Sequence, residues 1–132
     1  MRVNWPAILV ATVIFFLFGG LWYNVLGPAW RDALGAQAPQ TSTSAYAYIV
    51  AVIMSFFLAY AVARVLSWRG DYSAGRGAFI GLSLGLLIFG SMTWMTYAFE
   101  MSGATLGWIN VGFVAIGMAI QGAILGAWKP KS

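Results

Sequence analysis

Long apolar runs alternate with short polar connections along this chain of 132 residues. Each run lasts about 20 residues or more, the length that an α-helix needs to cross the hydrocarbon core of a bilayer. None of the runs carries a charged residue near its middle. The pattern therefore predicts an all-α membrane protein, a bundle of four transmembrane helices in a single domain. The predicted spans cover about residues 6–24, 44–68, 77–99 and 106–128.

The connection after the first run carries turn signals. Gly27 and Pro28 follow the run, and glycine accepts positive φ while proline sets φ for the start of a helix. We therefore expect a sharp turn at Gly27, followed by a short interfacial helix on the outer side from Pro28 to Leu34. The polar stretch 37–44 is predicted to be the longest exposed loop.

The first run has a competing interpretation. Arg2 precedes an apolar stretch that ends in the small residues Gly19 and Gly20, an arrangement typical of a cleaved signal peptide. The bulky neighbours Phe18 and Leu21 make a poor cleavage site. We therefore expect this run to remain in the protein as the first span.

Charged residues are too few for a soluble protein of this size. The chain has 7 Lys and Arg and 3 Asp and Glu, against 61% hydrophobic residues, so polar groups cannot cover its surface. Four spans place both termini on one side, and that side holds every basic residue except Arg31. The positive-inside rule then predicts cytoplasmic termini. Arg64 lies in the last turns of the second span and is expected to extend its charge outward to the interface.

The available side chains restrict the chemistry of this protein. The sequence contains no Cys and no His, which removes the usual metal ligands and acid–base groups. The only carboxylates are Asp32, Asp71 and Glu100, and none of them lies deep within a predicted span. Because a catalytic nucleophile needs a positioned base, we expect no enzyme activity, no metal site and no cofactor. The scattered positive charge also lacks the clustering that nucleic-acid binding requires.

Small residues recur at helical spacing in three of the predicted spans. Membrane helices associate through close backbone approach at such stripes. The spacing alone leaves open whether the partner helix belongs to the same chain or to another copy. The helix-packing stripes are Ala47, Ala51, Ser55, Ala59 and Ala63 in the second span, Gly77, Gly81 and Gly85 in the third, and Gly112, Ala115, Ala119, Gly122 and Gly126 in the fourth.

Two further sets of residues are candidates for a functional site. Polar residues on single faces of the third and fourth spans are candidates for a polar pathway, although contact with water at the outer boundary and bonding between helices are the simpler roles. Rings near the outer ends of the spans are expected to form one aromatic cluster, acting as a membrane belt or as a ligand cage. The polar set is Thr93, Tyr97, Glu100, Asn110 and Gln121, and the aromatic set is Trp22, Tyr23, Trp30, Trp94 and Trp108.

Several short motifs resemble a family of small bacterial membrane proteins known as domain of unknown function 1761. The resemblance covers nearly the whole chain. It implies a four-span protein of the bacterial plasma (inner) membrane and supplies no activity. The motifs are Asn4-Trp5 before the first span, Gly20-Leu21-Trp22-Tyr23 with Gly27 and Trp30 after it, Phe99-Glu100 closing the third span, and Gly122-Ala123-Ile124-Leu125-Gly126-Ala127-Trp128 closing the fourth.

These observations favour a structural or accessory membrane subunit that works through helix packing, in a homo-oligomer or a larger membrane complex. The alternative hypothesis is a small oligomeric transporter or channel for a small solute or ion. Small four-span exporters resemble one another in a membrane-embedded Glu in the first span, and this first span has none. The expected partners are the lipid bilayer and other membrane subunits, without nucleic acid.

Overall fold

The computed structural model describes residues 3–34, 45–100 and 103–130. Within these ranges the chain is helical and contains no strand. Four helices are long and apolar enough to cross a membrane, which confirms the predicted fold class. They are α1 (Trp5–Val25), α3 (Ala45–Arg69), the combined helix Ala74–Phe99 and α6 (Ala104–Ala127), and a short helix α2 (Gly27–Leu34) follows α1.

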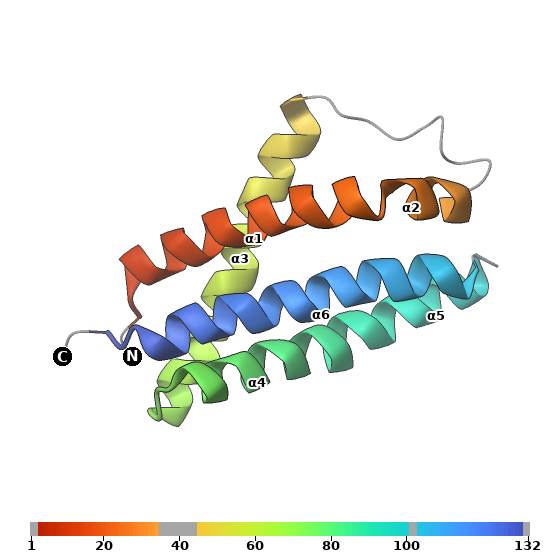
Figure 1. Cartoon of the computed structure of the whole chain (residues 1–132). Helices are drawn as coiled ribbons and strands as arrows, with labels where there is room; N and C mark the ends of the chain where they lie inside the picture. Colours follow the sequence, from red (N-terminus) through yellow and green to blue (C-terminus); the bar gives the residue numbers. More distant parts are fainter. Residues whose placement is uncertain (1–2, 35–44, 101–102, 131–132) are drawn as a thin grey trace.

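Helix α6 is the centre of the bundle. It lies between α1 and the Ala74–Phe99 helix, and the three run side by side (Figure 1). Helix α3 crosses behind them at a steep angle and contacts α1, α6 and α4 (Ala74–Leu84), the first part of the Ala74–Phe99 helix. The two chain ends lie at the same end of the bundle, as an even number of spans requires. We refer to this end as the terminal end and to the opposite one as the outer end.

Local sequence explains where the helices begin and end. At the start of α1, the Asn4 Oδ1 atom accepts a hydrogen bond from the Ala7 backbone N–H at 3.1 Å. At the start of the Ala74–Phe99 helix, Ser73 Oγ accepts one from the Arg76 backbone N–H, also at 3.1 Å. Such caps satisfy backbone N–H groups that have no partner within the helix. Gly70 follows α3 with a φ of 71°, a conformation that glycine adopts without steric cost.

The junction between α1 and α2 differs from the predicted sharp turn. Gly27 is the first residue of α2, and Gly70 is the only glycine with positive φ among the described residues. Helical hydrogen bonding continues on both sides of the junction, from Leu26 N to Trp22 O at 2.9 Å and from Trp30 N to Leu26 O at 2.8 Å. Pro28 lacks the N–H that would complete the ladder. The chain therefore bends there while α2 continues roughly along the direction of α1 (Figure 1), and the prediction of a sharp turn at Gly27 was wrong.

The third span contains a wide turn that the sequence pattern did not predict. It consists of α4 (Ala74–Leu84), a π-helical segment η2 (Gly85–Gly90) and α5 (Ser91–Phe99). Hydrogen bonds in a π-helix join residues five apart, so Gly85 and Gly90 lie one turn apart. Both residues are buried and face α6. The wide turn therefore keeps the glycine face directed at α6 along the span.

The two halves of α3 have different surroundings. From Ser55 onward, α3 contributes Ser55, Ala59 and Leu66 to the buried core between α1 and α6. The first half extends away from the other helices (Figure 1), and Tyr46 and Ile49 are exposed by 71% and 59%. The outer half of α3 therefore has few packing partners within this chain.

Candidate functional site

Glycines bring α4 and α6 into backbone contact. A Cβ atom built on Gly77 would overlap the Gly122 carbonyl oxygen, and one built on Gly122 would overlap the Gly77 carbonyl oxygen. At Gly81, a Cβ would overlap the Met118 carbonyl oxygen and would lie 3.1 Å from Ala119 N. The small-residue stripes of the third and fourth spans thus pack against each other within one chain. We call this contact the glycine seam, which also includes Gly85, Ala115 and Gly126.

Other members of the predicted stripes lie elsewhere. Gly112 faces α1, because a Cβ there would lie 3.2 Å from Trp22 Cζ2. In α3, Ser55 and Ala59 are buried in the bundle, whereas Ala51 is exposed. The sequence stripe in α6 therefore divides between two helices, and the stripe in α3 enters the core only from Ser55 onward.

Two glycines of α6 that the spacing did not single out for packing accommodate aromatic rings. A Cβ on Gly107 would lie 2.6 Å from Trp94 Cζ3, and a Cβ on Gly117 would lie 2.5 Å from Phe15 Cε2. Each glycine forms the recess that its ring fills. Spacing within one helix carries no signal for this fit, because the ring comes from a different helix.

Gln121 lies where α1, α3 and α6 meet. Its side chain is 0% exposed, and Nε2 donates to Ala11 O at 3.4 Å and to Ser55 O at 3.1 Å. Its Oε1 atom is also buried and has no hydrogen-bond partner. Thr12 and Ser55 are buried as well, and each hydroxyl donates to a carbonyl of its own helix at 2.7 Å. Gln121 therefore ties three helices together through two donated bonds, a common function of polar side chains between membrane helices.

A chain of hydrogen bonds links three helices near the outer end. Tyr23 OH donates to Asn110 Oδ1 at 2.6 Å, and Asn110 Nδ2 donates to Tyr97 OH at 2.7 Å. Close by, Trp22 Nε1 donates to Ile109 O at 3.0 Å. These bonds join α1 to α6 and α6 to α5, so the polar groups of this region are used to connect helices.

The predicted aromatic cluster is divided in two. Tyr23 and Trp30 meet edge to face with ring centroids 5.5 Å apart, and Trp94 meets Trp108 edge to face at 5.6 Å. Trp22 belongs with the first group, against Phe18 at 5.6 Å. No ring contact joins the Tyr23 group to the Trp94 pair among residues 3–34, 45–100 and 103–130. The rings brace α1 and α2 on one side of α6 and α5 on the other.

The five polar residues proposed for a pathway do not form one group. Tyr97 and Asn110 are bonded to each other, Thr93 is buried, and Glu100 is exposed at the end of α5. Gln121 follows Asn110 in α6 at a distance of about 16 Å along the axis, at 1.5 Å per residue. In the described part of the chain, no three Asp, Glu, His or Cys side chains come together to hold a metal ion.

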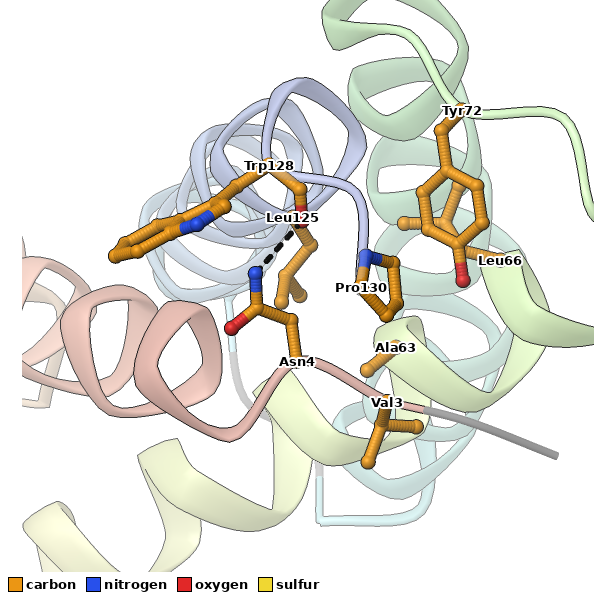
Figure 2. A pocket seen from close by; sticks show the side chains of 8 residues that line it. All are labelled: Val3, Asn4, Ala63, Leu66, Tyr72, Leu125, Trp128 and Pro130. Carbon is orange, nitrogen blue, oxygen red and sulfur yellow. Dashed lines mark hydrogen bonds between the residues drawn. The ribbon is translucent and has the colours of Figure 1, made fainter. Parts of the chain in front are cut away.

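A small pocket lies at the terminal end between α1, α3 and α6 (Figure 2). Asn4 Nδ2 donates to Trp128 O at 3.0 Å beside it, which ties the start of α1 to the end of α6. The pocket volume of about 10 Å³ leaves room for about one water molecule. Burial raises the pKa of Tyr72 beside the pocket, and a hydrogen bond with Ser67 acts in the opposite direction. The lining residues are Val3, Asn4, Ala63, Leu66, Tyr72, Leu125, Trp128 and Pro130.

Comparison with protein families identifies a matching family model. A family model described as "Protein of unknown function (DUF1761)" matches residues 6–126. No curated protein and no solved structure matches the chain. The matched range contains the glycine seam, Gln121 with its bonds to α1 and α3, and the hydrogen bonds that join Tyr23, Asn110 and Tyr97.

Proposed function

The chain belongs to the family of proteins of unknown function called DUF1761, and we propose that it is a structural or accessory subunit that works through helix packing, in a homo-oligomer or a larger membrane complex. The family description supplies no activity. The observation that carries the proposal is the outer half of α3, which the chain's own helices leave largely uncovered.

The exposure extends around the whole helix in one stretch of this segment, whereas Val50 is half-buried and the Tyr48 ring meets Phe16 of α1 edge to face at 6.2 Å. The four consecutive residues 51–54 are all exposed, and they cover more than one turn of about 3.6 residues. Tyr46, Tyr48 and Ile49 are exposed as well. By contrast, the glycine seam and the two polar junctions tie the other spans closely to one another. A steeply crossing helix with a largely exposed outer half supports a role in contacting another subunit.

The charge distribution supports a specific orientation in the bacterial inner membrane. At the terminal end, the described residues include Arg64, Arg69, Arg76 and Lys129, whereas Arg31 lies at the outer end. By the positive-inside rule this arrangement favours cytoplasmic termini. Two further basic residues, Arg2 and Lys131, lie outside the described residues.

Cross-linking in native membranes tests the subunit role. Because the chain has no Cys, a single Ile53→Cys substitution places one thiol on the outer half of α3. We expect an oxidant or a short thiol cross-linker to give a product larger than the monomer. Leu87→Cys is the matched control, since Leu87 is 71% exposed on the third span. Only monomeric product from Ile53→Cys, together with purification of the unaltered protein as a lone monomer, would contradict the proposal.

The alternative function, a small transporter or channel for a solute or ion, has one observation in its favour. The Oε1 atom of Gln121 is buried without a partner, and a buried polar atom without a hydrogen bond is a candidate to bind a water molecule or an ion. Flux measurements on the protein in liposomes distinguish the two functions. Solute movement by the unaltered protein that Gln121→Leu abolishes would support transport and contradict a purely structural role.

A further inference from the structure

An aromatic stripe that contains one arginine lies along the part of α3 that leads to the terminal end of the bundle. Phe56, Tyr60, Arg64 and Trp68 follow one another at intervals of four residues and therefore share one face of the helix. Trp5 of α1 covers the same face. Its ring stacks on Tyr60 with centroids 5.6 Å apart and on Phe56 at 6.4 Å. We call this set of five residues the Arg64 stripe.

The Arg64 guanidinium is held between two rings. Its Cζ atom lies 5.6 Å from the ring centroid of Tyr60 and 5.5 Å from that of Trp68. The side chain is partly buried, and the rings of Tyr60 and Trp68 hold its charge beside the last turns of α3. Cation–π contacts orient the group but do not neutralise its charge.

No carboxylate forms an ion pair with Arg64 among residues 3–34, 45–100 and 103–130. The ion pair found in the described part of the chain joins Arg76 to Asp71. The hydrogen bond from Arg64 Nη1 to Tyr60 OH is long, at 3.5 Å, and Nε is buried without an acceptor. An arginine side chain stays charged in proteins. At five residues before the last residue of α3, Arg64 lies about 7.5 Å inside the helix end, where an unneutralised charge is costly.

We propose that the Arg64 stripe binds one anionic phospholipid, with the lipid phosphate accepting hydrogen bonds from the Nη groups of Arg64. Arginine pairs with phosphate through two parallel N–H bonds, which gives a strong and oriented contact. Because Nε is enclosed, the Nη groups are the donors that remain for the phosphate. The site does not depend on the subunit role proposed above.

The neighbouring rings fit a lipid better than a free anion. Trp5 and Trp68 are 52% and 67% exposed, and indole rings favour the level of the lipid headgroups. Phe56 continues the stripe deeper into the bilayer, beside the path of an acyl chain. Basic residues at the cytoplasmic face attract anionic lipids in general, and the ring contacts distinguish Arg64 from the exposed Arg69 on the same helix.

The test compares lipid-dependent stability in three proteins. The unaltered protein, Arg64→Gln and Arg69→Gln are placed in nanodiscs of phosphatidylcholine, with and without phosphatidylglycerol, and the midpoint of thermal unfolding is measured. We expect phosphatidylglycerol to raise the midpoint of the unaltered protein and of Arg69→Gln, and to leave Arg64→Gln unchanged. Native mass spectrometry of the same proteins should show about tenfold weaker retention of phosphatidylglycerol by Arg64→Gln, the loss expected when a charged hydrogen-bond partner is removed.

Three outcomes would overturn the proposal. The first is an equal response of Arg64→Gln and the unaltered protein, which would show that the negative charge of the membrane as a whole, and not binding at Arg64, raises the midpoint. The second is an equal rise produced by inorganic phosphate in phosphatidylcholine discs, which would indicate a site for a free anion. The third is the absence of any response in the unaltered protein, a result that stands even when Arg64→Gln fails to fold. Arg64→Lys adds a check on geometry, since it keeps the charge but loses the paired N–H groups.

Discussion

Gly77 and Gly122 face each other so closely that a Cβ atom on either residue would overlap the carbonyl oxygen of the other. The contact is reciprocal, so neither helix has room to accept a side chain by a small shift. Helices in a membrane gain little from hydrophobic burial and depend on close packing. The glycine seam is therefore expected to contribute strongly to the stability of this bundle.

Substitution in the glycine seam should destabilise the protein. We expect Gly122→Ala to lower the free energy of unfolding by about 1–3 kcal/mol, the typical cost of overpacking, and Gly81→Leu to lower it further. Unfolding in mixed micelles with increasing denaturing detergent provides the measurement.

Two variants serve as controls for the glycine seam. Gly75 lies in the first turn of α4 with no atom within 4 Å of a built Cβ, so Gly75→Ala should be neutral or should stabilise the helix by up to about 1 kcal/mol. Leu86 is exposed by 45%, and Leu86→Ala should have a small effect. If Gly122→Ala behaves like these controls, α4 and α6 do not pack as closely as described.

A carboxyl group at position 121 should make stability depend on pH. In Gln121→Glu the side chain replaces a fully buried amide whose Nε2 donates to two carbonyl oxygens. Burial disfavours the charged form of a carboxyl group, and the two carbonyl oxygens that now accept from Nε2 would repel that charge. The folded protein then binds more protons than the unfolded one in the range where this carboxyl titrates, so stability falls as pH rises through that range.

The measurement is detergent unfolding of Gln121→Glu between about pH 8 and about pH 5, the range in which a buried carboxyl titrates. We expect the variant to gain stability as pH is lowered. Gln121→Leu is the matched control and should show no such gain. A pH-independent Gln121→Glu would place position 121 in contact with water.

Removing the Tyr23 hydroxyl should loosen the outer connection between α1 and α6. Tyr23→Phe removes the hydroxyl that donates to Asn110 Oδ1, so this half-buried oxygen loses its hydrogen bond from Tyr23. The expected loss is about 0.5–1.5 kcal/mol of unfolding free energy. Tyr46→Phe is the control, because the Tyr46 ring lies exposed on the outer half of α3. Equal effects of the two changes would show that the hydrogen-bond chain adds nothing to stability.

The proposed orientation predicts which positions react with reagents outside the cell. Single Cys residues at Ala29 and Thr105, both exposed near the outer end, should react with a membrane-impermeant maleimide in intact cells. Cys residues at Ala74 and Lys129, exposed near the terminal end, should react only after the membrane is opened. The native chain has no Cys, so no background labelling arises from this protein. Reaction at position 74 in intact cells would overturn the orientation.

The apolar pattern alone was sufficient to locate the spans. The predicted fourth span, about 106–128, corresponds to α6 at Ala104–Ala127, and the first, about 6–24, to α1 at Trp5–Val25. The reason is local: in lipid every backbone polar group must be satisfied within the span, so an apolar run of sufficient length forms a helix whatever its neighbours are. The short helix after the first span was also predictable, because its proline favours a helical first turn.

Tertiary structure decided how the spans meet. Spacing selected the glycines of the seam as packing residues but could not distinguish Gly112, which receives the ring of Trp22, from Gly122, which meets α4. The bond from Gln121 to Ala11 joins residues 110 positions apart. The wide turn at Gly85–Gly90 directs both glycines at α6, a match that no single-helix periodicity encodes. Helix formation in a membrane depends on the composition of one segment, whereas crossing angle, register and partner choice depend on the fit between two surfaces.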